Sequence, residues 1–380
     1  MIKSAYIHIP FCEHICHYCD FNKMFLKGQP VEEYLHMLRK EMQLTLKQAP
    51  TDQLMTIYVG GGTPTSLDEK QLVSLCEAIE EELPFDREKV EYTFEANPGD
   101  LSLEKLNVLK QAGVNRISFG VQSFDRDLLK KIGRTHEPED VFDSIEKARK
   151  VGFGNITIDL MYGLPGQTKE QFHHSLQQAF SLDLPHYSSY SLIVEPKTVF
   201  YNMMQKNKLH LPSQDLEAEM YEMLMEEMDK HGLNHYEISN FAKVGFESRH
   251  NTTYWNNDYY YGFGAGAHSY VNGERIANYG PLKKYIEPLH MNELPRMSVH
   301  AVPLNERMEE EMFLGLRKAE GVSFLTFEKR YNHDAKIVFG EQINTLLERG
   351  LVEIENDVIK LTHQGKLLGN EVFQSFIGID

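Results

Sequence analysis

The chain has 380 residues, of which 41% are hydrophobic and 25% are charged. These proportions are typical of a folded globular protein and exclude a disordered, collagen-like or coiled-coil chain. The net charge of −17 opposes non-specific attraction to phosphate backbones and anionic membranes, so we do not expect nucleic acid as a partner.

The N-terminal segment MIKSAYIHIPFCEH lacks the apolar core of a secretion signal. No stretch contains the ~18 consecutive apolar residues that cross a membrane. We therefore expect a cytoplasmic protein without a membrane span. The chain has four cysteines, which are too few for a disulfide scaffold.

Six β-rich segments alternate with helical segments over residues 1–200, beginning near residues 5, 56, 90, 115, 155 and 186. One helical segment carries Leu72, Leu75 and Ile79 on one face, and Ser66 with Glu69 predicts a capping box before it. Strict alternation of strand and helix predicts a parallel sheet in an α/β fold. Six units, where a complete barrel has eight, predict a partial (β/α)6 barrel with ligands at the carboxyl ends of its strands.

After residue 200 the alternation fades. Residues 201–305 form an extension with a helix in which Met220, Leu224 and Met228 share a face, as in ordinary core packing. Residues 306–380 predict three helices and a hairpin, which together resemble a winged-helix module. The extension and this module make an α+β C-terminal region. Because residues 313–380 carry 8 Lys/Arg and 10 Asp/Glu, we expect the module to pack or dock and not to read DNA.

Three cysteines, Cys12, Cys16 and Cys19, have the spacing C-x3-C-x2-C in a loop directly after the first strand. Three thiolates on one short loop can hold a cubane iron–sulfur cluster and leave one iron without a protein ligand. A zinc site of three cysteines and a nearby histidine is the alternative, and it would make the chain a zinc-stabilised interaction protein without redox chemistry.

The segment YIHIPFCEHICHYCDF resembles the cluster loop of the radical S-adenosylmethionine superfamily, which has an aromatic residue, here Tyr18, before the third cysteine. Within that superfamily the chain is similar to the coproporphyrinogen III oxidase-like branch. The similarity extends in register through GGGTPT (60–65), FEANP (94–98), SFGVQSFD (118–125), DLMYGLPGQT (159–168) and HNTTYW (250–255).

The resemblance implies a [4Fe–4S] cluster on Cys12, Cys16 and Cys19, with its open iron bound to the amino and carboxylate groups of S-adenosylmethionine. It also implies which residues contact S-adenosylmethionine: Tyr6, Gly61, Gly62, Thr63, Glu95, Gln122, Arg134 and Asp159.

The branch contains decarboxylating oxidases and haem chaperones that pass haem to respiratory proteins. Oxidases carry a further cysteine two positions after the third ligand, where this chain has Phe21, and a long segment before the loop, whereas here Cys12 lies twelve residues from the start. HNTTYW resembles the H-N-x-x-Y-W motif of the chaperones and implies His250 as a haem ligand. We therefore expect a haem chaperone that binds the cluster, S-adenosylmethionine and haem and delivers haem to acceptor proteins, membrane-associated ones included; the oxidase is the alternative.

Overall fold

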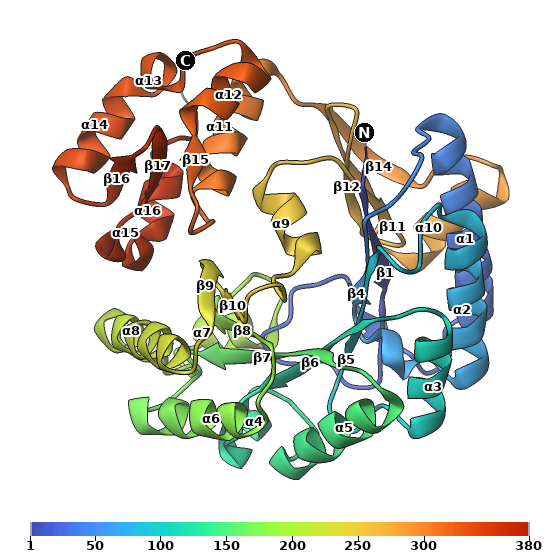
Figure 1. The fold of residues 1–380 in the computed structure, drawn as a ribbon. Helices are drawn as coiled ribbons and strands as arrows, with labels where there is room; N and C mark the ends of the chain where they lie inside the picture. The colour runs from blue at the N-terminus through green and yellow to red at the C-terminus, as the bar shows by residue number, and fades with distance from the viewer. Residues whose placement is uncertain (1, 379–380) are drawn as a thin grey trace.

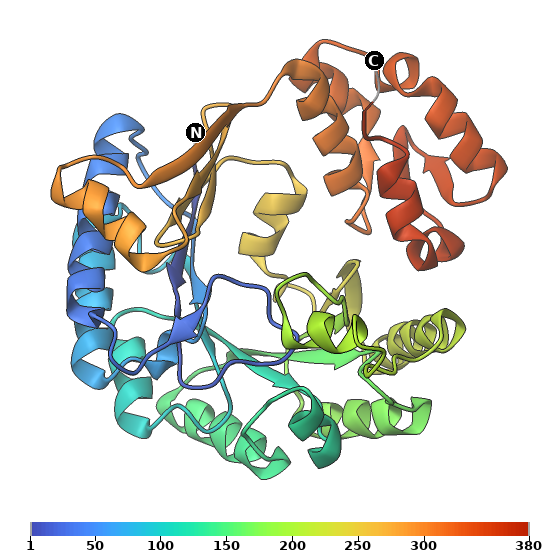
Figure 2. The same ribbon diagram turned by 180° about the vertical axis from the view of Figure 1, so that it is seen from behind.

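The computed structural model describes residues 2–378 (Figures 1 and 2). Its main feature is a twelve-stranded sheet with the order β14-β13-β12-β11-β1-β4-β5-β6-β7-β8-β10-β9. The six central strands run parallel and follow one another in chain order, as the sequence predicts. Because the two edges of the sheet do not pair, the barrel is partial. The six strands are β1 (Ser4–Ile9), β4 (Thr56–Gly61), β5 (Glu91–Ala96), β6 (Arg116–Gln122), β7 (Asn155–Tyr162) and β8 (His186–Ser191).

Helices cover the outer face of this parallel sheet (Figure 1). Leu72, Leu75 and Ile79 are buried, as their spacing predicts. The predicted capping box is wrong in position: Ser66 lies in the 3-10 turn η1 (Pro64–Ser66), and Asp68 caps the helix together with Gln71. The covering helices are α1 (Val31–Gln48), α2 (Glu69–Glu82), α3 (Leu103–Gln111), α4 (Arg126–Lys131), α5 (Pro138–Val151) and α6 (Lys169–Ser181).

The two faces of each parallel strand differ in polarity. In β4, Ile57 and Val59 are fully buried in the hydrophobic core, whereas Tyr58 between them lines the interior cavity of the barrel. Because successive side chains of a strand point to opposite faces, the same alternation in every strand gives an apolar outer layer and a polar lumen.

The extension after residue 200 continues the same sheet on both edges, so residue 200 is not a boundary within the sheet. On one edge β11 pairs parallel with β1, and three antiparallel strands follow; on the other edge β10 and β9 extend from β8. Met220, Leu224 and Met228 are buried in the core, as expected. The added elements are α7 (Val199–Met204), α8 (Gln214–Lys230), β9 (Asn234–Glu237), β10 (Asn240–Ala242), α9 (Arg249–Trp255), β11 (Tyr260–Phe263), β12 (His268–Val271), β13 (Glu274–Asn278), α10 (Leu282–His290) and β14 (Arg296–Ala301).

The C-terminal domain, which begins at Leu304, has its own hydrophobic core, formed by residues between Met308 and Phe376. Its three-stranded sheet has the order β15-β17-β16, and helices precede and follow the hairpin in the manner of a winged helix. No helix within residues 2–378 is long and apolar enough to cross a membrane. The elements are α11 (Leu304–Gly315), β15 (Val322–Ser323), α12 (Phe324–Tyr331), α13 (Ala335–Val338), α14 (Gly340–Glu348), β16 (Val352–Glu355), β17 (Val358–Leu361), α15 (His363–Leu367) and α16 (Gly369–Gln374).

One buried carboxylate joins the first helix to the extension. Glu41 of α1 accepts hydrogen bonds from the backbone N–H of Gly264 at 2.8 Å, from Asn278 Nδ2 at 2.6 Å and from the Tyr285 hydroxyl at 2.5 Å. Burial raises the pKa of Glu41 to about 7 in spite of these three donors. The contacts fix the loop after β11, strand β13 and helix α10 against α1.

We predict that Glu41 makes the stability of the fold depend on pH. The pKa of Glu41 is higher in the folded than in the unfolded chain, so its contribution to the free energy of unfolding is most favourable below about pH 4.5. This contribution is lost as the pH rises through 7, and the loss is at most roughly 3 kcal/mol. Glu41→Gln should therefore reduce the difference between the free energies of unfolding at pH 5 and pH 8, measured in urea. Glu77→Gln, at an exposed position of α2, should leave that difference as in the wild type; equal changes in both variants would contradict the assignment.

Candidate functional site

A cavity of about 360 Å³ occupies the lumen of the partial barrel. It opens at the cysteine loop, beside the carboxyl ends of the strands, and extends inward to Ser248 and Asn251 at the start of α9. Every residue that the sequence assigns to the cluster or to S-adenosylmethionine lines this cavity, except Tyr6. The fold therefore brings together residues that are as much as 147 positions apart, from Cys12 to Asp159.

The three cysteines lie at the mouth of the cavity. Cys12 ends the short strand β2 (Phe11–Cys12), which pairs with β3 (Met24–Phe25), and is buried, whereas Cys16 and Cys19 are half-buried. Burial raises the pKa of Cys12 to about 11 and also raises that of Cys19, while the Thr63 hydroxyl donates to Cys12 Sγ at 3.7 Å. Thiolates are the metal-binding form, so loading of a metal here must release protons.

A single zinc ion needs its ligands within ~2.3 Å of one point. Among residues 2–378 no three side chains of the His, Cys, Asp or Glu type converge in that way. Thiolates of a cubane cluster bind separate irons and can stand farther apart, so this arrangement is compatible with a [4Fe–4S] cluster.

Glycines form a bare cradle beside the cysteines. A Cβ on Gly62 would lie 2.8 Å from the Phe11 carbonyl oxygen and 2.9 Å from Cys12 Sγ, and one on Gly60 would lie 2.7 Å from the Glu95 carboxyl. Gly61 has a φ of +116°, which side-chain-bearing residues rarely adopt. Gly61 and Gly62 line the cavity without a side chain, so a ligand can approach the backbone closely there.

Two carboxylates project into the lumen. Glu95 lies one residue before the end of β5, and Asp159 lies in the middle of β7. Burial raises the pKa of Glu95 to about 7 and that of Asp159 to about 6. Glu95 accepts from the Tyr58 hydroxyl at 2.8 Å and from the Gly61 N–H at 3.1 Å.

Arg134 connects the cysteine loop to the strands. Its Nη1 donates to Asn97 Oδ1 at 2.5 Å and its Nη2 to the Tyr18 hydroxyl at 3.0 Å. Its Nε is buried and has no hydrogen-bond partner within the described part of the chain. Gln122, at the end of β6, is buried with a φ of +67°, a strained conformation of the kind found at functional sites. An orphaned donor beside a bare glycine cradle fits a polar ligand with acceptor atoms, as S-adenosylmethionine is.

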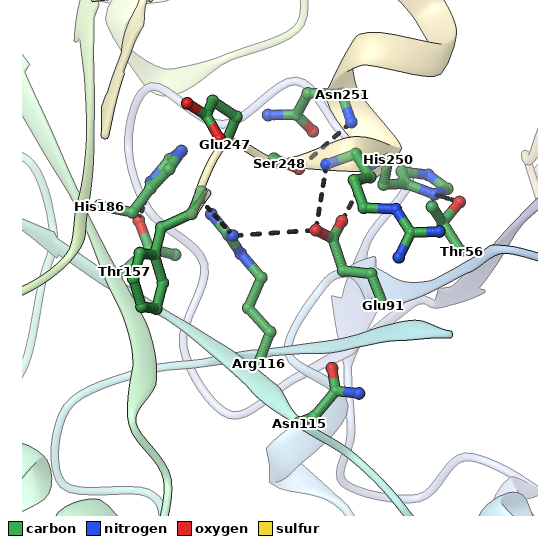
Figure 3. Close-up of polar contacts among 12 residues, drawn as sticks. Thr56, Glu91, Asn115, Arg116, Thr157, His186, Glu247, Ser248, His250 and Asn251 are labelled. Atoms are coloured by element: carbon green, nitrogen blue, oxygen red, sulfur yellow. Dashed lines mark hydrogen bonds and ion pairs between the residues drawn. The ribbon is translucent and has the colours of Figure 1, made fainter. Parts of the chain in front are cut away.

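Two predicted residues do not line the cavity. The Tyr6 hydroxyl lies 3.0 Å from His8 Nδ1, and the ring stacks on Tyr58. His250 lies in α9, where its Nδ1 is 2.9 Å from the Thr56 hydroxyl (Figure 3). Its Nε2 is 2.8 Å from the Tyr254 hydroxyl. Burial lowers the pKa of His250 to about 3, so the imidazole is neutral. Both ring nitrogens are thus engaged, and binding of iron requires the loss of one of these bonds.

Sequence reasoning missed the residues that line the inner half of the lumen. They occupy inward positions of the strands, and a search for polar residues at every second strand position would have found them: Tyr58, Thr93, Ser118, Thr157, Ser188 and Arg116. Arg116 is buried beside Glu91 at 3.9 Å and donates to the Phe246 carbonyl at 3.0 Å (Figure 3).

Comparisons with known proteins agree with this architecture. The family model of the radical SAM superfamily matches residues 6–179, and that of the HemN C-terminal domain matches residues 302–368. The solved structure of coproporphyrinogen III oxidase (HemN) from Escherichia coli superposes with a TM-score of 0.86 at 24% identity, over 99% of this chain and 90% of that one. At this identity the match establishes the fold.

Sequence relatives extend over the whole chain. The heme chaperone HemW of Bacillus subtilis is 57% identical over 377 residues, which are 99% of this chain and 100% of that protein. The protein of the same name in Lactococcus lactis is 47% identical over 99% of this chain and 97% of its own length, and that in Escherichia coli is 32% identical over 98% of each. The chain therefore belongs to the radical SAM superfamily and, within it, to the family of proteins named heme chaperone HemW.

Proposed function

We propose that this protein is a haem chaperone that binds a [4Fe–4S] cluster, S-adenosylmethionine and haem and delivers haem to acceptor proteins. The observation that carries the proposal is the 57% identity to a heme chaperone over essentially the full length of both chains. The polar lumen, the cysteine loop and the glycine cradle support the cofactor assignment independently of any name.

A [4Fe–4S] cluster, when bound, supplies one iron free for the amino and carboxylate groups of S-adenosylmethionine. Cys12, Cys16 and Cys19 would hold the cluster at the mouth of the cavity. The backbone of Gly61 and Gly62 offers polar groups to the methionyl end, together with the Thr63 hydroxyl. The places that these residues occupy around the cavity support these proposed roles.

The remaining cavity residues can orient the nucleoside end of S-adenosylmethionine. Glu95 and Asp159 can accept hydrogen bonds from the ribose hydroxyls, and their negative charge favours the cationic sulfonium. Arg134 holds Tyr18 and Asn97 in place and keeps one donor for the ligand. Gln122 offers its side-chain amide at the end of β6. Tyr6 would act through Tyr58 and His8, because it does not itself line the cavity.

Binding of haem iron by His250 would require its hydrogen bond to Tyr254 to open. Its Nε2 becomes available to iron when the hydrogen bond to Tyr254 opens, while Thr56 can still hold Nδ1 and fix the ring orientation. The alternative, decarboxylation of coproporphyrinogen III, is disfavoured by Phe21 at the position where oxidases carry a further cysteine.

The glycine cradle generates a test of cluster binding. Gly62→Ala should displace Cys12, because the new Cβ would lie within 2.9 Å of its sulfur, and should remove most of the iron and sulfide that the wild type retains after anaerobic reconstitution. Cys16→Ser should lose the cluster as well, with the circular dichroism of the barrel unchanged. Gly154→Ala is the matched control, since a Cβ there meets no atom within 4 Å. Full iron content in Gly62→Ala or Cys16→Ser would contradict the assignment.

The raised pKa of Glu95 generates a test of S-adenosylmethionine binding. Because the cationic ligand prefers the ionised carboxylate and the pKa of Glu95 is about 7, the affinity should rise roughly tenfold from about pH 6 to about pH 8. Glu95→Gln should bind more weakly and lose most of this pH dependence in anaerobic calorimetry. Glu146→Gln, on the exposed face of α5, should behave as the wild type. A pH dependence that persists undiminished in Glu95→Gln would assign it to another group.

Haem titration followed by absorption spectroscopy tests the proposed function. We expect the wild type to bind haem with a shifted Soret band and His250→Ala to bind it at least about tenfold more weakly. The loss of an iron ligand should reduce the affinity at least as much as the loss of a residue that hydrogen-bonds to such a ligand. His268→Ala, at an exposed position, is the control. An unaltered spectrum and affinity in His250→Ala would place the haem elsewhere.

An anaerobic turnover assay with reductant, S-adenosylmethionine and coproporphyrinogen III separates the two functions. We expect no decarboxylated product from protein with an intact cluster. Multiple turnovers would establish the oxidase and overturn the chaperone proposal.

A further inference from the structure

Helix α9 lies between the barrel and the C-terminal domain (Figures 1 and 2). Its amino end is held by the barrel. The carboxylate of buried Glu91 accepts from the backbone N–H groups of Arg249 at 3.0 Å and His250 at 2.9 Å (Figure 3). The Thr253 hydroxyl lies 2.8 Å from that of Ser4. The first backbone N–H groups of a helix have no partner within the helix and attract negative charge, so a carboxylate there is stabilising. These contacts attach α9 to the barrel.

The carboxyl end of α9 is held by the C-terminal domain instead. Lys318 Nζ donates to Asn256 Oδ1 at 2.6 Å. Arg330 donates to two backbone carbonyls just past the helix, those of Asn256 at 2.7 Å and Asn257 at 2.6 Å. The guanidinium of Arg317 lies 4.5 Å from the ring centre of Trp255. These four contacts join two bodies that have separate hydrophobic cores.

Much of the remaining interface is polar, and its apolar part includes Ile238, which packs against the C-terminal core, and Leu367, which packs against the core of the barrel. Two backbone hydrogen bonds cross it, from Ile238 N to Arg317 O at 3.1 Å and from Ala319 N to Tyr236 O at 3.0 Å. Arg275 of β13 pairs with Glu310 of α11 at 2.9 Å. Polar interfaces between domains resemble those of transient complexes, for which relative motion is the default expectation.

Three buried polar atoms at this interface lack a hydrogen-bond partner within residues 2–378: Glu237 Oε2, Trp255 Nε1 and Arg317 Nε. An unpaired buried polar group opposes burial, because water would satisfy it in an open state. The docked arrangement is therefore weakened by the atoms it covers. The chain between the bodies is short, since only Val302 and Pro303 separate β14 from α11.

We propose that the C-terminal domain is a hinged cover, latched on the carboxyl end of α9 by Lys318, Arg330 and Arg317, and that it undocks at Val302–Pro303 to admit haem to the α9 side of the barrel. The haem part rests on the proposed function; the hinged cover does not. Undocking exposes the indole of Trp255 and frees the end of α9, whereas Glu91 and Thr56 keep the amino end of the helix in place.

Trp255 reports on the latch directly, because it is the only tryptophan of the chain. The test is acrylamide quenching of its fluorescence in the full-length protein without haem. Lys318→Ala and Arg330→Ala should each shift the equilibrium toward the undocked state by about ten- to a hundredfold, the factor expected for loss of a hydrogen bond to a charged group. Quenching should rise accordingly.

Matched controls lie in the same domain. Lys360 pairs with Glu355 at 2.8 Å and Arg349 with Glu371 at 2.6 Å, both away from α9, so Lys360→Ala and Arg349→Ala should quench as the wild type does. Hydrogen exchange separates undocking from unfolding: the amides of Ile238 and Ala319 should exchange faster in the latch variants, whereas those of the β16–β17 hairpin should stay protected.

Unchanged quenching and exchange in both latch variants would overturn the hinged cover. The rate of haem association tests the second part, and it should rise in Lys318→Ala relative to Lys360→Ala. If Trp255 is more exposed in Lys318→Ala but the rate of haem association is unchanged, the link between undocking and haem entry is overturned. Absence of haem binding in every variant, the wild type included, would count against the proposed function and leave the quenching result intact.

Discussion

The structure depends on the two-sided character of six parallel strands. Their outward side chains, such as Ile57 and Val59, form a dry layer against the helices, and their inward side chains are hydroxyls, carboxylates, imidazoles and a guanidinium. Buried polar groups are costly unless they are hydrogen-bonded, so such a lumen is retained only where the groups satisfy one another or meet a ligand. Thr93 and the Nε of Arg134 are buried and have no partner within the described residues, which is consistent with a ligand in the lumen.

The barrel is open, and an open barrel must be covered on one side. Residues 201–305 add strands to both edges of the parallel sheet, and α9 lies between these two edges (Figure 1). Glu91 anchors that helix through its backbone, and Arg116 anchors the preceding segment through the Phe246 carbonyl. The HNTTYW motif thereby acquires a structural role, because His250 and Thr253 bind the barrel and Trp255 meets the C-terminal domain.

The same arrangement separates the site that we propose for the cofactors from the side at which we propose that haem enters. Cysteines and glycines at the mouth of the cavity suit a cluster and its S-adenosylmethionine, whereas the α9 side is separated from that mouth by the depth of the lumen. A cargo handled on the α9 side would leave the mouth to the cofactors. The C-terminal domain covers the α9 side through an interface that is more polar than the cores on either side of it, and this is the interface at which we propose that the cover undocks.

The sequence by itself determined the number and direction of the parallel strands, the cysteine loop, the family and ten of the residues that line the cavity. These features are local or periodic: the spacing of Cys12, Cys16 and Cys19 is readable in eight positions, and strand–helix alternation implies a parallel sheet. Only the tertiary structure decided that the extension joins the sheet, that Asp159 lies within a strand and that both nitrogens of His250 are engaged. Those facts depend on contacts between distant segments, such as Thr56 with His250 and Glu91 with α9, and no local pattern of residues encodes which distant partner a buried polar group will find.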